Sequence, residues 1–246
     1  MSDPSIRHEM ARRTRRSLLV GGLAALAGGG AWEWLRTRRE DDSEAWPLRA
    51  ALRINEQLWR DYSRNTRLAR TFPASAVDAP RYNGGEGMEG PVAPDWKLRV
   101  EGMTDSGPLS LGMDDIRALP KTEMITELKC IEGWARVIQW GGARFRDFVD
   151  RYATLDVDPD AYVGMATPDG KYYVGLDAAS ALHPQTLLCY EMNGQPLAEK
   201  HGAPLRLVIP VKYGIKNIKR IGRISYQTTR PGDYWAEDGY DWYAGF

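Results

Sequence analysis

The sequence predicts a single mixed α+β domain that follows an N-terminal export or anchor segment. Apolar residues make up 43% and charged residues 27% of the 246-residue chain, a balance that supports a packed core and excludes wholesale disorder. Several short apolar runs bounded by turn residues predict strands, and these do not alternate regularly with helices. Because Lys and Arg total 33 and Asp and Glu total 33, no global charge directs the chain to nucleic acid.

The N-terminal segment, residues 1–46, has the pattern of an export address. A cluster of Arg12, Arg13, Arg15 and Arg16 precedes an uncharged, glycine-rich run over residues 17–32. Residues 14–19, Thr-Arg-Arg-Ser-Leu-Leu, resemble a twin-arginine signal, which a bacterial export receptor reads. That route carries proteins that are already folded, commonly because a cofactor was inserted first, so it favours a bound redox cofactor. The alternative is the basic start of an ordinary soluble helix.

The sequence leaves open whether this segment is cleaved or retained. The uncharged run is short for a membrane-spanning helix of roughly 20 residues. Ala25-Leu26-Ala27 offers a cleavage site, whereas Trp34 followed by Arg36 is typical of a membrane interface. Both alternatives predict a periplasmic or exported protein, anchored in the second case through residues 17–35, with residues 47–246 as a separate folded domain.

Within residues 47–246, apolar periodicity and turn signals mark the expected elements. Spaced leucines predict an amphipathic helix over residues 48–70, and four Pro and four Gly predict a long loop over residues 71–95. A loop of this length in a compact domain is more often functional than idle. A second helix is expected from Phe145 to Tyr152, after a break at Gly141-Gly142. Strands are expected over residues 96–101, 124–130, 161–166, 171–176, 187–192 and 205–209.

Cys130 is a candidate metal or substrate ligand because it ends a predicted strand, which places its thiol at the rim of the sheet. A thiolate suits a soft or high-valent redox metal, and nearby positive charge would lower its pKa. With only Cys130 and Cys189 in the chain, a disulfide-dense scaffold and a cysteine-rich zinc or iron–sulfur site are excluded. The alternatives for Cys130 are an inert buried thiol, a disulfide with Cys189, or a nucleophile. Cys189 itself fits an inert core thiol.

A stretch without acidic residues lies late in the chain and predicts an anion site. Residues 201–232 contain no Asp or Glu. The same stretch carries Arg206, Lys212, Lys216, Lys219, Arg220, Arg223 and Arg230. Within it, Gly214 lets backbone amides approach a phosphate closely, and Lys216 supplies a counter-charge. A solvated basic face is the plain alternative. Nucleic acid is not expected as the ligand, because folding before export takes the protein away from it.

Three motifs together resemble the sulfite oxidase superfamily of molybdopterin-binding oxidoreductases. They are the Cys-x-Glu-x-Trp segment at residues 130–134, the turn Glu191–Pro196 that leads into His201–Pro210, and Tyr213-Gly214-Ile215-Lys216. Within the superfamily the chain is most similar to the exported bacterial branch that contains the periplasmic methionine-sulfoxide reductase catalytic subunit. The resemblance covers roughly residues 80–230 and implies the α+β fold of the superfamily's molybdopterin-binding domain.

The resemblance implies a molybdenum centre held by the dithiolene of one molybdopterin, with Cys130 as the protein thiolate on the metal. The residues that match the family's cofactor-binding positions are Asn83, Thr167, His201, Arg206, Gly214, Ile215 and Lys216. No haem is expected in this chain. Electrons are therefore expected to pass to or from a separate carrier, such as a membrane cytochrome.

Glu132, two residues after Cys130, is expected to set the substrate preference. Sulfite oxidases proper carry basic residues in this segment, whereas a carboxylate repels an anion and can relay a proton to a bound oxygen. Alternatively, Glu132 only orients a neighbour. The leading hypothesis is oxygen-atom transfer to or from a small, sulfur-containing substrate. Its rivals are a non-catalytic exported module that kept the fold, and a thiol hydrolase or peroxidase with Cys130 as nucleophile.

Overall fold

The chain consists of two compact units, residues 1–53 and 54–246, and each is described by itself. A computed structural model describes residues 4–41, 44–62, 67–155, 158 and 160–246. The division between the units falls inside the helix α2 (Trp46–Tyr62). The domain boundary expected between residues 46 and 47 stays a prediction.

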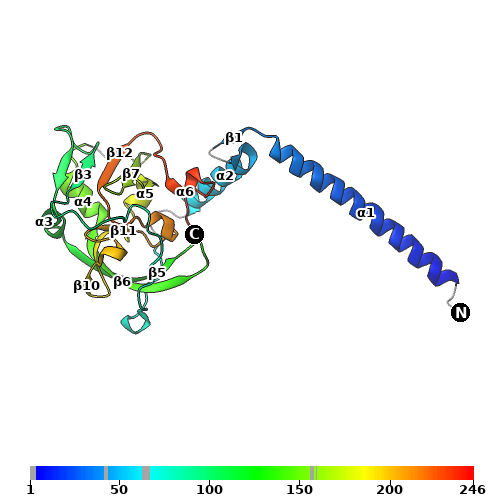
Figure 1. Ribbon diagram of the computed structural model, residues 1–246, viewed down its shortest axis with the longest axis horizontal. Helices are drawn as coiled ribbons and strands as arrows, with labels where there is room; N and C mark the ends of the chain where they lie inside the picture. Colours follow the sequence, from blue (N-terminus) through cyan, green and yellow to red (C-terminus); the bar gives the residue numbers. More distant parts are fainter. Residues whose placement is uncertain (1–3, 42–43, 63–66, 156–157, 159) are drawn as a thin grey trace. The chain divides into compact units, whose positions relative to one another are not determined.

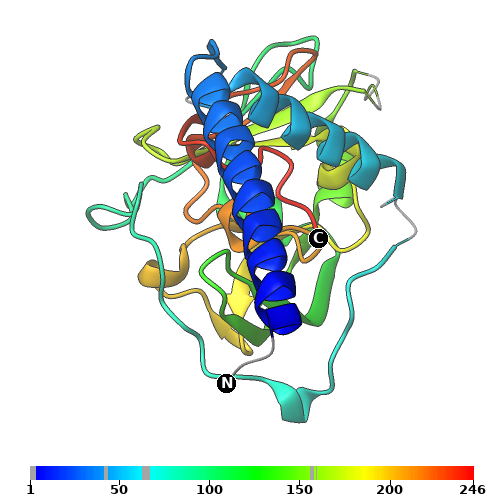
Figure 2. The ribbon, with the colours of Figure 1, turned by 90° about the vertical axis from the view of Figure 1, so that its right-hand side faces the viewer.

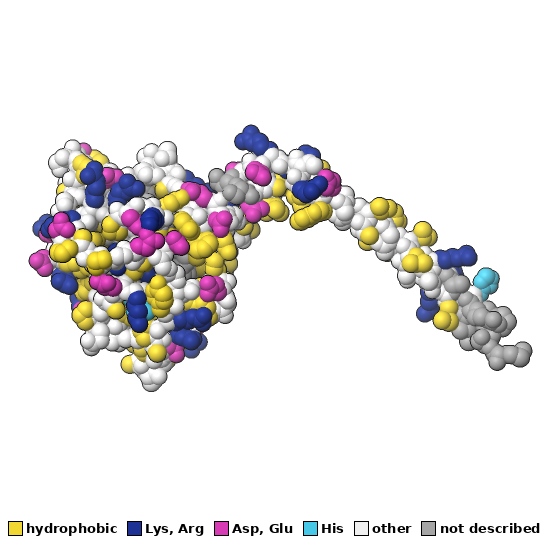
Figure 3. Space-filling view, viewed as in Figure 1, with side chains coloured by type: hydrophobic (Ala, Val, Ile, Leu, Met, Phe, Trp, Pro, Cys, Tyr) yellow, Lys and Arg dark blue, Asp and Glu magenta, His cyan; other side chains and the backbone are white. Residues whose placement is uncertain are grey.

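The first unit is dominated by the helix α1 (Pro4–Arg36), which is followed by the short strands β1 (Glu40–Asp41) and β2 (Glu44–Ala45). Residues 8–36 are long and apolar enough to cross a membrane, judged by length and composition alone. Figure 3 shows apolar side chains along the middle of α1 and basic side chains toward its two ends. This arrangement is compatible with either a signal or an anchor.

The second unit is built mainly of strands, with short helices between them (Figure 1). Its strands are β3 (Leu98–Glu101), β4 (Leu109–Leu111), β5 (Lys121–Lys129), β6 (Ala135–Arg144), β7 (Tyr162–Ala166), β8 (Tyr173–Asp177), β9 (Leu187–Met192), β10 (Gln195–Pro196), β11 (Arg206–Val208) and β12 (Arg223–Gln227). Its other elements are the helices α3 (Met113–Arg117), α4 (Phe145–Tyr152), α5 (Ala178–Ala181) and α6 (Tyr234–Glu237) and the 3₁₀ turns η1 (Ala74–Ala76), η2 (Glu199–His201) and η3 (Gly214–Lys216). The fold class is mixed α+β, as the sequence predicts.

In the described part of this unit the strands form two five-stranded sheets. One sheet has the order β10-β9-β6-β5, with β11 also paired to β9, and the other has the order β4-β3-β12-β7-β8. Every pairing is antiparallel except that of β3 with β12. Side chains of both sheets and of α4 meet in one apolar core, in which Leu98, Phe148, Val163, Leu188 and Leu207 are at most 2% exposed.

The segment between α2 and β3 follows the outside of the second unit (Figure 2). The helix expected over residues 48–70 is too long. It ends at Tyr62, residues 63–66 lie outside the described part, and residues 67–70 are not helical. Instead, the Gln185 side chain holds the Ala69 backbone, accepting from its N–H at 2.7 Å and donating to its carbonyl at 3.0 Å. The expected loop over residues 71–95 contains the short turn η1 and an isolated bridge between Thr71 and Thr126.

The pair Gly141-Gly142 lies inside β6, so the sequence-based expectation of a break at this point is wrong. The helix α4 does begin at Phe145, close behind the strand. The pairing of β6 with β9 shifts register between the two glycines, which marks a bulge. A Cβ atom on Gly142 would lie 2.2 Å from the carbonyl oxygen of Leu188. Glycine is therefore required where β6 approaches β9 most closely.

We expect Gly142→Ala to lower the free energy of unfolding by roughly 1–3 kcal/mol, the cost of overpacking a closed interior site. Gly141→Ala is the matched control, because its Cβ would meet the Glu191 side chain, at 3.0 Å from Oε2, and that side chain can move. Urea unfolding of the two full-length variants, followed by tryptophan fluorescence, measures the difference. Equal losses in both variants would contradict the close approach at Gly142.

Candidate active site

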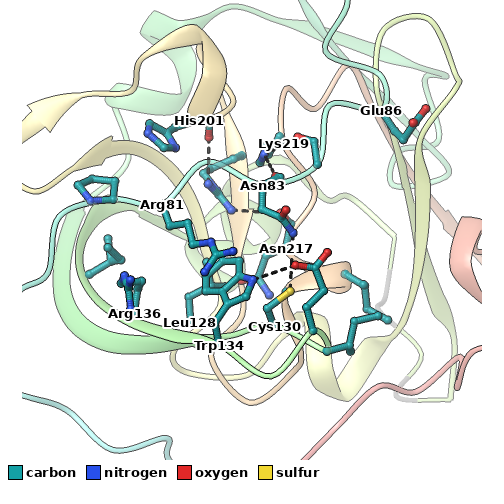
Figure 4. Close-up of a pocket in the computed structure, with 18 of the residues that line it drawn as sticks. Arg81, Asn83, Glu86, Leu128, Cys130, Trp134, Arg136, His201, Asn217 and Lys219 are labelled. Carbon is teal, nitrogen blue, oxygen red and sulfur yellow. Dashed lines mark hydrogen bonds between the residues drawn. The ribbon is translucent and has the colours of Figure 1, made fainter.

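A cavity of about 200 Å³ opens where the hairpin of β5 and β6 meets the loop at residues 80–86, the turn η3 and the helix α6. It brings together the sequence-predicted residues Asn83, Cys130, Glu132, His201, Arg206, Gly214 and Ile215. Two others, Thr167 and Lys216, are not on its wall. Figure 4 shows that the labelled cationic groups and the Cys130 sulfur face the same space from different elements.

Cys130 lies in the turn that joins β5 to β6, directly after the last residue of β5. Its N–H donates to the Trp134 carbonyl at 2.9 Å, and the Gly133 N–H donates back to the Cys130 carbonyl at 3.1 Å. Gly133 has a φ of 87°, a left-handed conformation that glycine adopts readily. The tight turn therefore leaves the half-buried thiol on the cavity wall, at the strand end where the sequence predicts it.

The second cysteine has a different environment. Cys189 is fully buried in β9, and burial raises the pKa of its thiol to about 11. Both cysteines are free, so the alternative of a Cys130–Cys189 disulfide is wrong. Cys189 is a core thiol, as its apolar surroundings in the sequence predict.

Asn83 reaches the cavity from the long loop before β3. Its side-chain Nδ2 lies 3.8 Å from the Cys130 sulfur, a distance suited to a weak N–H to sulfur hydrogen bond (Figure 4). The two residues are 47 positions apart in the chain. The loop is therefore part of the site and not only a connection.

Glu132 is exposed at the cavity mouth, and its carboxylate has a defined partner. The Trp134 indole Nε1–H donates to Glu132 Oε2 at 3.0 Å. The other side of the same ring carries a cation, because the Arg81 guanidinium lies 4.7 Å from the Trp134 ring centroid. These three side chains from two segments hold the carboxylate beside the thiol-bearing turn.

Arg206 is a buried cation on the wall of the same cavity. It is 3% exposed, and its guanidinium donates to the carbonyls of His201 at 3.0 Å and Asn217 at 3.3 Å. Its Nε has no hydrogen-bond partner among the described residues. Burial lowers the pKa of Arg206 to about 10, so it remains a cation at neutral pH. A buried cation that no carboxylate neutralises is costly in the protein alone.

His201 lines the same cavity in its neutral form. Burial, together with the nearby charges of Arg206, Lys200 and Lys219, lowers the pKa of His201 to about 4. The imidazole is therefore uncharged at neutral pH and can donate or accept a hydrogen bond. The positive charge near His201 on the cavity wall comes from Arg206 and Lys219.

The Lys216 side chain is not on the cavity wall, so the expected role of its ammonium as a counter-charge stays a prediction. Lys216 is fully buried and forms an ion pair with Asp233, and it donates to the Gly175 carbonyl at 2.9 Å. The preceding residues Gly214 and Ile215 do line the cavity. The Tyr172 hydroxyl fixes this turn by donating to the Ile215 carbonyl at 2.6 Å. A backbone role for Lys216 stays a prediction.

Thr167 lies beneath the long loop. It is 2% exposed, and its hydroxyl donates to Asp169 Oδ1 at 2.6 Å. A Cβ on Gly87 would approach the Thr167 side chain to 2.5 Å, so the loop backbone covers it directly. Its expected cofactor contact stays a prediction.

The site also contains residues that sequence reasoning did not assign. Lys219 belongs to the acid-free stretch, but the sequence does not distinguish its role from those of the other basic residues there. Arg81 and Tyr172 carry no motif of their own, because their places follow from tertiary contacts. The charge pattern was the one usable signal, and it could not say which lysine faces the cavity.

The donor set fits a metal that another molecule holds. Among the described residues no three His, Cys, Asp or Glu side chains cluster as a metal site. Cys130 can therefore add one thiolate to a metal whose remaining ligands come from elsewhere, as the dithiolene of a molybdopterin supplies them. The unpartnered Nε of Arg206, which lines the same cavity, fits an anionic group such as the pterin's phosphate.

A solved structure shares this fold. The sulfane dehydrogenase SoxCD from Paracoccus pantotrophus aligns with a TM-score of 0.50 and 16% identity, over 68% of this chain and 46% of that one. At this identity the likeness concerns the fold alone.

Sequence relatives extend the comparison. A provisionally named protein-methionine-sulfoxide reductase subunit, YedZ1, of Azospira oryzae is 33% identical over 94% of this chain and 86% of its own length. The protein-methionine-sulfoxide reductase catalytic subunits MsrP of Campylobacter jejuni and Xanthomonas campestris are 34% and 35% identical, and this chain spans only 56% and 47% of their lengths.

A family model for the oxidoreductase molybdopterin-binding domain matches residues 88–235, more than half of the chain. That range begins within the long loop and includes the turn with Cys130, the cavity residues Arg206 and Lys219 and the start of α6. The chain therefore belongs to the molybdopterin-binding oxidoreductases of the sulfite oxidase type, and it is an enzyme of that class.

Proposed function

We propose that this chain is an exported molybdoenzyme that reduces a sulfoxide, with Cys130 as the protein ligand of a molybdenum–molybdopterin centre. One observation carries the proposal: the Cys130 thiol and the buried Arg206 cation, whose Nε has no hydrogen-bond partner among the described residues, line the same cavity. The names of the relatives, protein-methionine-sulfoxide reductase subunits, indicate the substrate class and the direction of the reaction. Oxidation of sulfite is the alternative outcome of the test.

The cavity residues divide into those that would hold the metal and those that would hold the pterin. Cys130 would supply the thiolate, and Arg206 and His201 would bind the phosphate. The turn Gly214–Ile215 would bind the cofactor next to the Cys130 turn, because a Cβ on Gly214 would lie 3.3 Å from the Lys129 carbonyl oxygen. When bound, the cofactor supplies a redox metal that accepts or releases an oxygen atom. Arg206 would then gain the anionic partner that the folded chain does not give it.

Glu132 would supply protons to the oxygen atom that leaves the substrate. Reduction breaks the S–O bond, takes an electron pair from a separate carrier and takes protons from the site, and it releases water. Glu132 is exposed to solvent and close to the Cys130 turn, so it can move protons between the two. Its negative charge would also disfavour sulfite, an anion, relative to a neutral sulfoxide.

The rim of the cavity suits an uncharged side chain. Ile131, Trp235 and Tyr240 line the cavity beside Glu132, and Ile131 and Tyr240 are 36% and 41% exposed. Trp235 and Tyr240 pack edge to face at a centroid distance of 5.3 Å, which makes a firm apolar wall. A thioether or sulfoxide side chain of a polypeptide is of the size and polarity that such a wall accepts.

Electrons would come from a separate carrier in the membrane, such as a cytochrome. The relatives' names describe subunits, which implies a partner of this kind. The helix α1 would act as signal or anchor and leave the second unit in the periplasm.

The proposal predicts stoichiometric molybdenum in protein purified from cells with an intact cofactor pathway. Cys130→Ser should retain the pterin but lose turnover of sulfoxide with an artificial electron donor by several orders of magnitude, because the metal loses its protein thiolate. Cys189→Ser, which alters a buried core thiol, is the matched control and should retain activity. Absence of molybdenum, or an active Cys130→Ser, would refute the proposal.

Loss of the Arg206 charge should weaken binding of the pterin in the cavity. We expect Arg206→Gln to lower pterin retention on gel filtration by roughly ten- to a hundredfold, because a charge-assisted contact to the phosphate is lost. Arg223→Gln is the control, because it removes an exposed cation of the same acid-free stretch that does not line the cavity. Equal pterin loss in both variants would argue against a phosphate at Arg206.

Glu132→Gln separates proton transfer from simple orientation. The amide keeps an oxygen that accepts from Trp134 but carries no titratable proton. We expect kcat for sulfoxide reduction to fall by roughly 10²–10⁴-fold with a flattened pH profile, and inhibition by sulfite to become stronger. Steady-state kinetics across pH test both effects. An unchanged kcat would leave Glu132 as an orienting group only.

A further inference from the structure

Two adjacent cations hold the long loop onto the cavity. The Lys219 ammonium donates to the backbone carbonyls of Asn83 and, at 2.8 Å, Gly84. The Arg220 guanidinium donates to the carbonyls of Glu89 at 3.3 Å and Gly90 at 2.8 Å. All four acceptors are backbone oxygens, so the contacts fix the path of the loop and not its side-chain identity.

Lys219 is linked to the Cys130 sulfur through Asn83. Lys219 binds the carbonyl of the residue whose side-chain amide lies 3.8 Å from Cys130 Sγ. Figure 4 shows Lys219, Asn83 and Cys130 in one row along the cavity, joined by the dashed contacts. A shift of the Asn83 backbone would move the amide away from the sulfur.

Lys219 is partly buried and has defined partners, unlike a lysine on the surface. The ammonium lies 4.8 Å from the Tyr82 ring centroid, and burial together with Arg206 lowers the pKa of Lys219 to about 8. A lysine is held in such surroundings at a cost in solvation, which the carbonyl contacts offset in part. By contrast, Lys171 pairs with Glu89 at the outer part of the same loop, and both side chains are more than half exposed.

We propose that Lys219 is a positioning residue that holds the Asn83 amide against the Cys130 sulfur. Hydrogen bonds to a ligating thiolate tune its donor strength, so the position of this amide would set the properties of the metal centre. The inference rests on the proposed function only in the identity of the metal, because the contacts themselves belong to the protein.

The first test uses full-length protein produced without molybdate, so that Cys130 carries no metal. Iodoacetamide labelling read by peptide mass spectrometry measures the alkylation rate of Cys130, with the buried Cys189 as internal reference. Lys219→Met should raise that rate roughly fivefold or more, because the Asn83 amide no longer covers the sulfur. Lys219→Arg, which can donate to both carbonyls, should restore the wild-type rate.

Lys171→Met is the matched control, because it removes an exposed contact at the outer part of the same loop. The alkylation rate of Cys130 in this variant should equal that of the wild type. Equal rates in Lys219→Met and wild type would overturn the proposal, and so would equal increases in Lys219→Met and Lys171→Met. If Lys219→Met does not unfold cooperatively, Asn83→Ala replaces it. It must also react faster than wild type.

A second measurement uses the molybdenum-loaded enzyme. The electron paramagnetic resonance spectrum of the half-reduced metal should shift in the same way in Lys219→Met and Asn83→Ala, and the double variant should show no further shift. Independent shifts would contradict action through Asn83. Protein without molybdenum would defeat the proposed function, whereas the alkylation result would still decide the role of Lys219.

Discussion

The site depends on one electrostatic constraint: Arg206 is buried as a cation, and no carboxylate of the described residues pairs with it. Its two hydrogen bonds go to the carbonyls of His201 and Asn217, and its Nε has no acceptor among the described residues. Backbone carbonyls reduce but do not remove the cost of a buried charge. The apolar core between the two sheets must supply the stability that keeps β11, and with it Arg206, in place.

The part of the cavity around Cys130 is organised differently, by turns and loops and not by burial. The tight turn after β5 presents Cys130, the Trp134 indole orients Glu132, and the long loop brings Asn83 across the sulfur. Such an arrangement leaves Glu132 exposed and Cys130 half-buried, whereas Arg206 is buried in the same cavity. The loop has little regular structure, and the contacts of Lys219 and Arg220 with its backbone carbonyls explain how it keeps a fixed position.

The sequence predicted what depends on local signals and missed what depends on tertiary contacts. Cys130 is predictable because it ends an expected strand and begins the Cys-x-Glu-x-Trp segment, and Arg206 because it lies in the stretch without acidic residues. Lys216 and Lys219 could not be told apart, since both lie in that stretch. The structure distinguishes the two lysines, because Lys216 forms an ion pair with Asp233. Asp233 is the first acidic residue after the stretch. β6 was overlooked because its glycine pair reads as a break, although it is a bulge.

The same constraint connects the cavity to the proposed route of export. An anion that binds only the folded chain stabilises it in proportion to its affinity, and the gain is larger where it relieves a buried charge. The empty protein therefore carries at Arg206 a cost that the phosphate of a pterin would remove. A protein whose cavity is completed by a cofactor benefits from folding around it before it crosses the membrane. The twin-arginine pattern at residues 14–19 is the kind of signal that such an order of events requires.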